Sequence, residues 1–109
     1  MNRPLYCYRL NEMTRQLECY VINEYTVVSL GAFTDKKEIR FDARLTGLKT
    51  KAVYYLKSEN IDRFVRGCLF TYESDSTRAY EIIKHSLKTQ IELATEKLKK
   101  LQNIYDTLN

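Results

Sequence analysis

The sequence of 109 residues contains no tryptophan, one histidine, one proline and only three glycines. Three glycines cannot form a glycine-rich phosphate-binding loop, and neither G-x-G-x-x-G nor G-x-S-x-G occurs. The single histidine, His85, excludes an H-x-x-x-H zinc pair, and its position is typical of the polar face of a helix. These absences argue against the common enzyme classes. We therefore predict a non-enzymatic protein with no catalytic residue, no cofactor and no metal site.

Paired cysteines and long apolar runs are missing as well. Cys7, Cys19 and Cys68 are odd in number and lack the C-x-x-C spacing, which favours a reduced protein. Residues 1–10 have no apolar region with a small-residue cleavage site, and no run is long enough to cross a bilayer. We expect a cytoplasmic protein that does not enter a membrane. We also expect Cys7 and Cys19 to be small apolar side chains that face each other in the first hairpin.

The composition of the chain is typical of one folded domain. Apolar residues make up 44% of the chain, and the nine tyrosines suit strands and half-exposed surfaces because each has an apolar body and a polar tip. The formal net charge of +4 permits contact with nucleic acid or an acidic protein and requires neither. We expect residues 1–109 to form a single domain, with a sheet-rich body at 1–75 and a long helix at 76–109.

Alternation of apolar and polar residues predicts the strands of this body. We expect an α+β fold with an antiparallel or mixed sheet of about five strands. Ser58 as an N-cap and Gly67 as the residue after the last turn predict one short helix at about 59–66. The segments with strand character are 4–10, 15–22, 25–30, 38–45, 49–57 and 68–72.

The most legible unit is a hairpin of segments 38–45 and 49–57, with Gly47 as the permissive residue of its turn. A slip of one residue would exchange its apolar and polar faces, so the register is strongly specified. The expected pairs are Ile39 with Leu56, Phe41 with Tyr54, Ala43 with Ala52 and Leu45 with Thr50 on the inner face, and Glu38 with Lys57 and Arg40 with Tyr55 on the outer face.

The last part of the chain predicts a helix at about 76–108, with Asp75 or Ser76 as its N-cap. From Leu87 onward its apolar residues follow at steps of four and three, the a and d positions of a coiled coil. About 30 helical residues reach roughly 45 Å, whereas a typical strand covers only ~17–20 Å. We expect residues 80–94 to complete the protein's own core. The remainder either pairs with nothing or packs against a second copy or a target protein, through an interface of Leu93, Leu98, Leu101, Tyr105 and Leu108.

A basic stretch at residues 44–57 is the candidate surface for nucleic acid or an acidic partner. It contains four basic residues and no acidic one, with tyrosines between them. Cations beside an exposed aromatic ring can bind phosphates and stack a base; the other interpretation is an ordinary charged sheet face. The residues of this candidate surface are Arg40, Arg44, Lys49, Lys51, Tyr55 and Lys57.

The chain has a family likeness in three features. These are its length, its order of strands followed by a long helix, and its bias toward Tyr, Lys, Ile and Asn. The segments that carry it are YCYRLNEMTRQLECYVI, KKEIRF, YYLKSENIDRF and AYEIIKHSLKTQIELATEKLKKL. The chain resembles the small uncharacterised accessory proteins of phages and mobile elements of low-GC Gram-positive bacteria, over most of its length. This resemblance implies a protein that works by binding, and inhibitors of host defence systems are frequent among such proteins. We expect a homodimeric binding protein that inhibits a host protein by occlusion; the alternative is a nucleic-acid-binding accessory protein.

Overall fold

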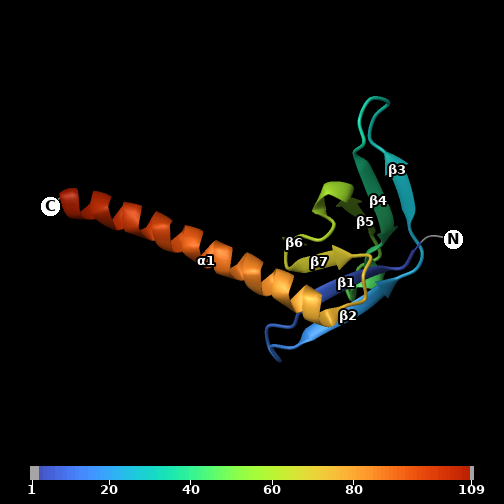
Figure 1. Ribbon diagram of the computed structural model, residues 1–109, viewed down its shortest axis with the longest axis horizontal. Helices are drawn as coiled ribbons and strands as arrows, with labels where there is room; N and C mark the ends of the chain where they lie inside the picture. The colour runs from blue at the N-terminus through green and yellow to red at the C-terminus, as the bar shows by residue number, and fades with distance from the viewer. Residues whose placement is uncertain (1–2, 109) are drawn as a thin grey trace.

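Seven strands and one long helix make up the part of the chain, residues 3–108, that the computed structural model describes (Figure 1). The predicted α+β class is confirmed, but the strands form two antiparallel sheets instead of one. The elements are β1 (Leu5–Leu10), β2 (Leu17–Ile22), β3 (Thr26–Ser29), β4 (Lys37–Asp42), β5 (Val53–Lys57), β6 (Phe64–Val65), β7 (Cys68–Thr71) and α1 (Ser76–Thr107), with short 3-10 turns at Ala43–Thr46 and Ser58–Asn60.

The first sheet has the strand order β2-β1-β7-β6, and the second sheet has the order β3-β4-β5. Every neighbouring pair is antiparallel, and only β1 and β7 are distant in sequence. β1 therefore lies in the interior of the first sheet. Its two faces are both apolar because one is covered by the second sheet and the other by α1.

The hairpin of β4 and β5 has the register that the sequence predicts. Ile39 pairs with Leu56 and Phe41 with Tyr54 on the inner face, while Glu38 meets Lys57 and Arg40 meets Tyr55 outside. Both strands are shorter than predicted, because Ala43–Thr46 turns into a 3-10 helix that Asp42 caps and Gly47 ends with a φ of +82°. The amide of Ala43 still donates to the Ala52 carbonyl at 2.9 Å, so the register persists into the turn.

The short helix predicted at 59–66 is wrong. The segment makes one 3-10 turn, a single parallel bridge from Ile61 to Phe70, and then the two-residue strand β6. Asp62 has a left-handed backbone with a φ of +63°, which stops helical winding. Arg66 and Gly67 also have positive φ, so they close a tight β6–β7 hairpin of the kind that favours glycine. Gly67 is thus a hairpin residue, not the end of a helix.

The main core lies between the two sheets. Phe41 and Tyr54 of the second sheet stack with their ring centroids 5.0 Å apart, and Phe70 of the first sheet packs on both rings at 5.8 and 5.3 Å. Other buried members are Leu5, Cys7, Ile22, Ile39, Leu56 and Cys68.

Cys7 and Cys19 do not face each other as the sequence suggested. Cys7 pairs with Tyr20, and Cys19 pairs with Tyr8, so the two cysteines point to opposite faces of the first sheet. Cys19 is exposed, whereas Cys7 is buried in the core between the sheets. A hydrogen bond with Cys68 and burial both raise the pKa of the Cys7 thiol. Cys7 therefore behaves as a neutral core residue.

The start of α1 covers the other face of the first sheet. Ala79 and Ile83 are buried against Tyr8 and Leu69. Asp75 is the N-cap, as one of the two predicted choices, because its carboxylate accepts from the amide of Arg78 at 3.1 Å. The molecule thus has three layers, the second sheet, the first sheet and the base of α1, and the rest of the helix leaves the body (Figure 1).

Candidate functional site

The distal part of α1 protrudes from the body as a free helix (Figure 1). Every residue from Lys88 to Leu108 is exposed, so contact with the sheet ends at Leu87, about two turns before the predicted Ala94. The strands of the first sheet have six residues at most and cannot cover more of the helix. The radius of gyration is 17.9 Å, against about 13 Å for a compact domain of this length. The protruding part spans roughly 30 Å.

The five predicted interface residues all lie on this free helix. Their exposed fractions range from 55% for Leu101 to 79% for Leu108. Leu98, Leu101, Tyr105 and Leu108 share one face at a and d spacing, and Ile91 continues that face toward the body. Leu93 lies to one side of it, together with Ile104. We call the face formed by Ile91, Ala94, Leu98, Leu101, Tyr105 and Leu108 the seam.

An apolar groove continues the seam at the base of the helix. It has a volume of about 840 Å³ and runs between α1 and the β1–β2 hairpin. Its apolar walls are Leu10 and Leu17 from the hairpin and Tyr80, Ile83, Leu87 and Ile91 from α1, with Glu12, Arg15, Lys84, Lys88 and Glu92 as its charged residues. Sequence reasoning did not find this groove, because residues about 70 positions apart in the chain form it.

The predicted basic surface is divided and partly neutralised. Arg40, Tyr55 and Lys57 share the outer face of the second sheet, where the Arg40 guanidinium lies 5.4 Å from the Tyr55 ring. Arg40 also pairs with Glu38 at 2.8 Å. Arg44, Lys49 and Lys51 instead belong to the turn and loop between β4 and β5.

Arg44 forms an exposed ion pair with a neighbouring carboxylate. It pairs with Asp42 at 2.6 Å. Its side chain and its backbone amide hydrogen-bond to that carboxylate and hold the pKa of Asp42 at about 2. The surface therefore brings carboxylates and cations together, and its net positive charge is smaller than the sequence of 44–57 suggested.

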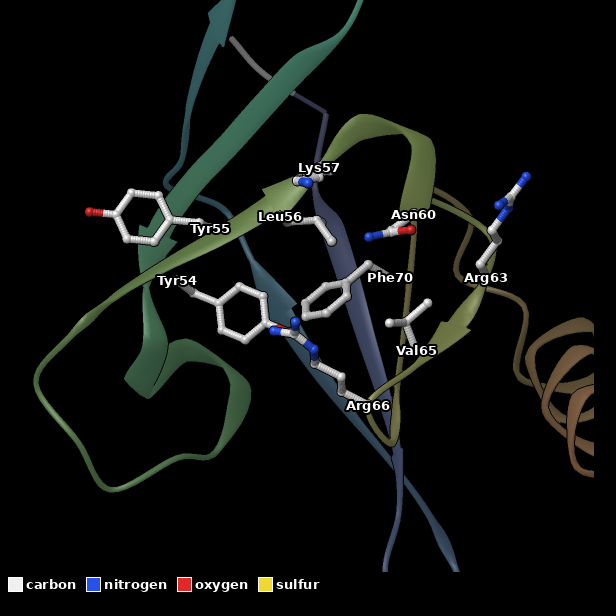
Figure 2. A pocket seen from close by; sticks show the side chains of 9 residues that line it. All are labelled: Tyr54, Tyr55, Leu56, Lys57, Asn60, Arg63, Val65, Arg66 and Phe70. Atoms are coloured by element: carbon white, nitrogen blue, oxygen red, sulfur yellow. The ribbon is translucent and has the colours of Figure 1, made fainter. Parts of the chain in front are cut away.

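A second hollow, of about 140 Å³, lies between the edge strands β5 and β6 (Figure 2). The rings of Tyr54 and Phe70 line it, and Figure 2 shows Arg66 extending toward the far end of Tyr54 while Arg63 points away from the rings. Its lining includes three cations, Lys57, Arg63 and Arg66, and no carboxylate among the residues that the structure describes. Burial raises the pKa of Tyr54. Of the residues that line this hollow, the sequence predicted only Lys57 and Tyr55 as candidate binding residues.

Residues 3–108 show neither a metal-binding cluster nor a membrane-spanning helix. No group of three or more His, Cys, Asp or Glu side chains in this range could hold a metal ion. Over the same residues, no helix is both long and apolar enough to cross a membrane.

Comparison with known proteins does not assign the chain. No protein-family model matches the sequence, no curated protein matches it, and no solved structure matches the fold. The surfaces described above are therefore the observations from which a function can be inferred.

Proposed function

We propose that this protein acts by binding another macromolecule, and that the protruding part of α1, residues 88–108, is its binding element. The observation that carries this proposal is the seam, whose large side chains are all more than half exposed. Burial of one such side chain contributes about 1.5–3 kcal/mol. A contiguous apolar stripe of this size on a soluble domain is typical of an association site.

The partner that packs directly on residues 88–108 is another copy of the chain. The seam, together with Leu87 before it, keeps a and d spacing, which is the pattern by which two helices pack knobs into holes. A lone two-helix contact of this length is marginal in water, so the bodies would have to take part in the contact.

The dimer then acts on a host target by occlusion. The resemblance to accessory proteins of phages and mobile elements supports a cytoplasmic inhibitor of a host defence protein, and an inhibitor of this kind needs a rigid surface, not a catalytic residue. Two sheet bodies held at fixed positions by a paired helix would present such a surface to the target.

Sedimentation velocity at micromolar concentration tests the proposal. We expect the wild-type chain to sediment as a dimer, and the variant Leu98→Lys with Leu101→Lys to sediment as a folded monomer with an unchanged β-sheet circular dichroism signal. A matched control, Thr89→Lys with Asn103→Lys, adds the same charge on the side of α1 away from the seam and should remain dimeric. A wild-type chain that stays monomeric up to about 100 μM would remove the proposed dimer.

A second candidate function, nucleic-acid binding, has one observation in its favour. The hollow between β5 and β6 combines two aromatic rings with Lys57, Arg63 and Arg66. Stacking on an aromatic ring and contact of cations with phosphates are the two components of single-strand binding.

Fluorescence anisotropy with a labelled single-stranded oligonucleotide tests this candidate. If it is correct, affinity falls steeply with salt, and Lys57→Glu with Arg63→Glu abolishes binding through the hollow. Loss of binding in Lys49→Glu with Lys51→Glu alone would assign the contact to the β4–β5 loop instead. Absence of any shift in anisotropy at low salt would exclude both.

A further inference from the structure

We infer that the two copies of the proposed dimer run antiparallel, so that the tip of each α1, residues 101–108, fills the groove at the base of the other. This inference rests on the proposed function, because it concerns how the same helix pairs. It commits the groove to one occupant, the tip of a second copy of this chain.

The groove and the seam are two halves of one apolar surface. Tyr80, Leu87 and Ile91 line the groove and continue the helical spacing of Leu98 and Leu101. The base half has the β1–β2 hairpin beside it, whereas the tip half has no neighbour. In an antiparallel pair each tip lies along the other copy's base, so both halves are covered.

A parallel pair would leave much of this surface uncovered. It would bring two bases together, each of which already carries its own sheet and hairpin, so the helices could close only beyond Leu87. About five side chains per copy would then be buried, at roughly 60–120 Å² each, for a total near 800 Å². This total is in the range of crystal-packing contacts.

The antiparallel pair buries enough area for a stable dimer. About ten apolar side chains per copy take part, since Leu10, Leu17, Tyr80, Leu87 and Ile104 join the seam. By the same measure the total is about 1,600 Å², the size of a standard specific interface. The groove has a volume of about 840 Å³ and runs along the side of α1 on which the tip of the other copy would lie.

Charge selects the register of this pair. In antiparallel coiled coils an a residue packs beside a d residue of the other helix, which allows Leu101 to lie beside either Lys84 or Ile91 of the other copy. The second alignment would bring Lys97 of one copy against Lys97 of the other. The alignment of Leu101 with Lys84 puts Lys97 beside the other copy's Gln90 and brings no like charges together. We therefore assign this register.

The same register accounts for the flanking residues of the groove. It puts Tyr105 of one copy beside the half-exposed Tyr80 of the other, which lines the groove. Lys84 lies next to Leu101, where its aliphatic stem can cover the leucine while its ammonium group stays in water.

Disulfide trapping tests the orientation in full-length chains that carry Cys19→Ser to remove the exposed native thiol. Lys84→Cys and Leu101→Cys are prepared as two separate variants, because a disulfide needs Cα atoms about 4.4–6.8 Å apart. In a glutathione redox buffer, we expect an equimolar mixture to form the 84–101 cross-linked dimer and neither variant alone to form one. Sedimentation and circular dichroism of each variant check that it still folds and associates.

Each other outcome overturns a defined part of the inference. A cross-link formed by Leu101→Cys alone shows a parallel pair, which overturns the orientation and leaves the proposed dimer intact. A cross-link between Lys84→Cys and Leu108→Cys, in place of the 84–101 link, overturns the register. A wild-type chain that sediments only as a monomer overturns the inference together with the proposed function, so the two failures are distinguishable.

Discussion

Gly47 lies directly against the ring of Tyr20, so that a Cβ atom at position 47 would be only 2.6 Å from Tyr20 Cζ. Gly47 ends the 3-10 turn after β4, and Tyr20 belongs to β2 of the first sheet. The same turn is also held by Arg9, whose guanidinium donates to the Thr46 carbonyl at 3.0 Å. The contact therefore joins the end of the β4–β5 hairpin to the first sheet.

Replacing Gly47 by alanine should destabilise the protein for two reasons. The left-handed backbone costs a non-glycine residue roughly 1–2 kcal/mol, and the forced displacement of Tyr20 adds about 1–3 kcal/mol. We expect Gly47→Ala to lower the free energy of unfolding by about 2–4 kcal/mol in urea denaturation.

Gly67→Ala is the matched control for this prediction. Gly67 has nearly the same backbone, with a φ of +78°, but a Cβ there would have nothing within 4 Å. Gly67→Ala should therefore show the backbone cost alone, roughly 1–2 kcal/mol. Equal losses in the two variants would mean that Tyr20 moves aside at no cost, which would contradict the contact as we interpret it.

The base and the tip of α1 should respond differently to truncation of an isoleucine. Ile83 is buried against the first sheet, so Ile83→Ala should lower the free energy of unfolding by about 2–4 kcal/mol at every protein concentration. Ile104 is 57% exposed and has no neighbour within its own chain's body. Ile104→Ala should raise the dissociation constant of the dimer and leave the monomer unchanged within about 0.5 kcal/mol.

Urea denaturation at two protein concentrations, tenfold apart, separates these effects. We expect the urea midpoint of the wild-type chain to rise with protein concentration. If Ile104→Ala weakens this dependence and Ile83→Ala preserves it, the result agrees with the division of α1 at Leu87. If Ile83→Ala cost no more than Ile104→Ala in the monomer, the base of the helix would not be packed as described.

The N-cap of α1 supplies a third test of stability. Asp75 accepts a hydrogen bond from the amide of Arg78, whose side chain also pairs with Asp62 at 3.2 Å and with Glu73 at 3.5 Å. Asp75→Ala should lower the free energy of unfolding by about 1 kcal/mol. Asp75→Asn keeps an acceptor and should restore most of that loss, whereas equal losses in both variants would assign the effect to charge alone.

Sequence patterns correctly predicted the elements for which several local signals indicate the same structure. Strict alternation at 38–42 and 53–57 fixed the register of β4 and β5, because any slip would have put Phe41 and Leu56 in water. The long helix follows from more than 30 residues without glycine or proline and from the cap at Asp75. These signals are local, so no knowledge of the tertiary contacts was needed.

The failures arise where contacts distant in sequence decide the structure. The same Ser58 and Gly67 that suit a helix also suit a 3-10 turn and a tight hairpin, and pairing of Phe64 with Leu69 selects the hairpin. β1 is apolar on both faces, so alternation could not set the position of Cys7 relative to Cys19. The groove and the hollow between β5 and β6 each join segments from different elements, and no single stretch of sequence signals them.

The last prediction concerns acid stability and the pair of Asp42 and Arg44. The side chain and the backbone amide of Arg44 hold the pKa of Asp42 at about 2 in the folded protein, below the ordinary value of about 3.9 that applies to the unfolded chain. Because the folded pKa is the lower one, the stabilisation is fully present above about pH 4. It is lost as the pH falls toward 2 and the carboxylate becomes protonated.

Removing either partner of this pair should make the stability of the folded protein depend less on pH in this range. We expect the urea midpoint of Asp42→Asn and of Arg44→Met to fall less steeply than that of the wild-type chain between pH 5 and pH 2, as measured by circular dichroism. The difference should shrink at high salt, because the pair is exposed and its charges are screened. If both variants kept the wild-type slope, the acid sensitivity would have to come from other carboxylates, and the 3-10 turn that Asp42 caps would not depend on this ion pair.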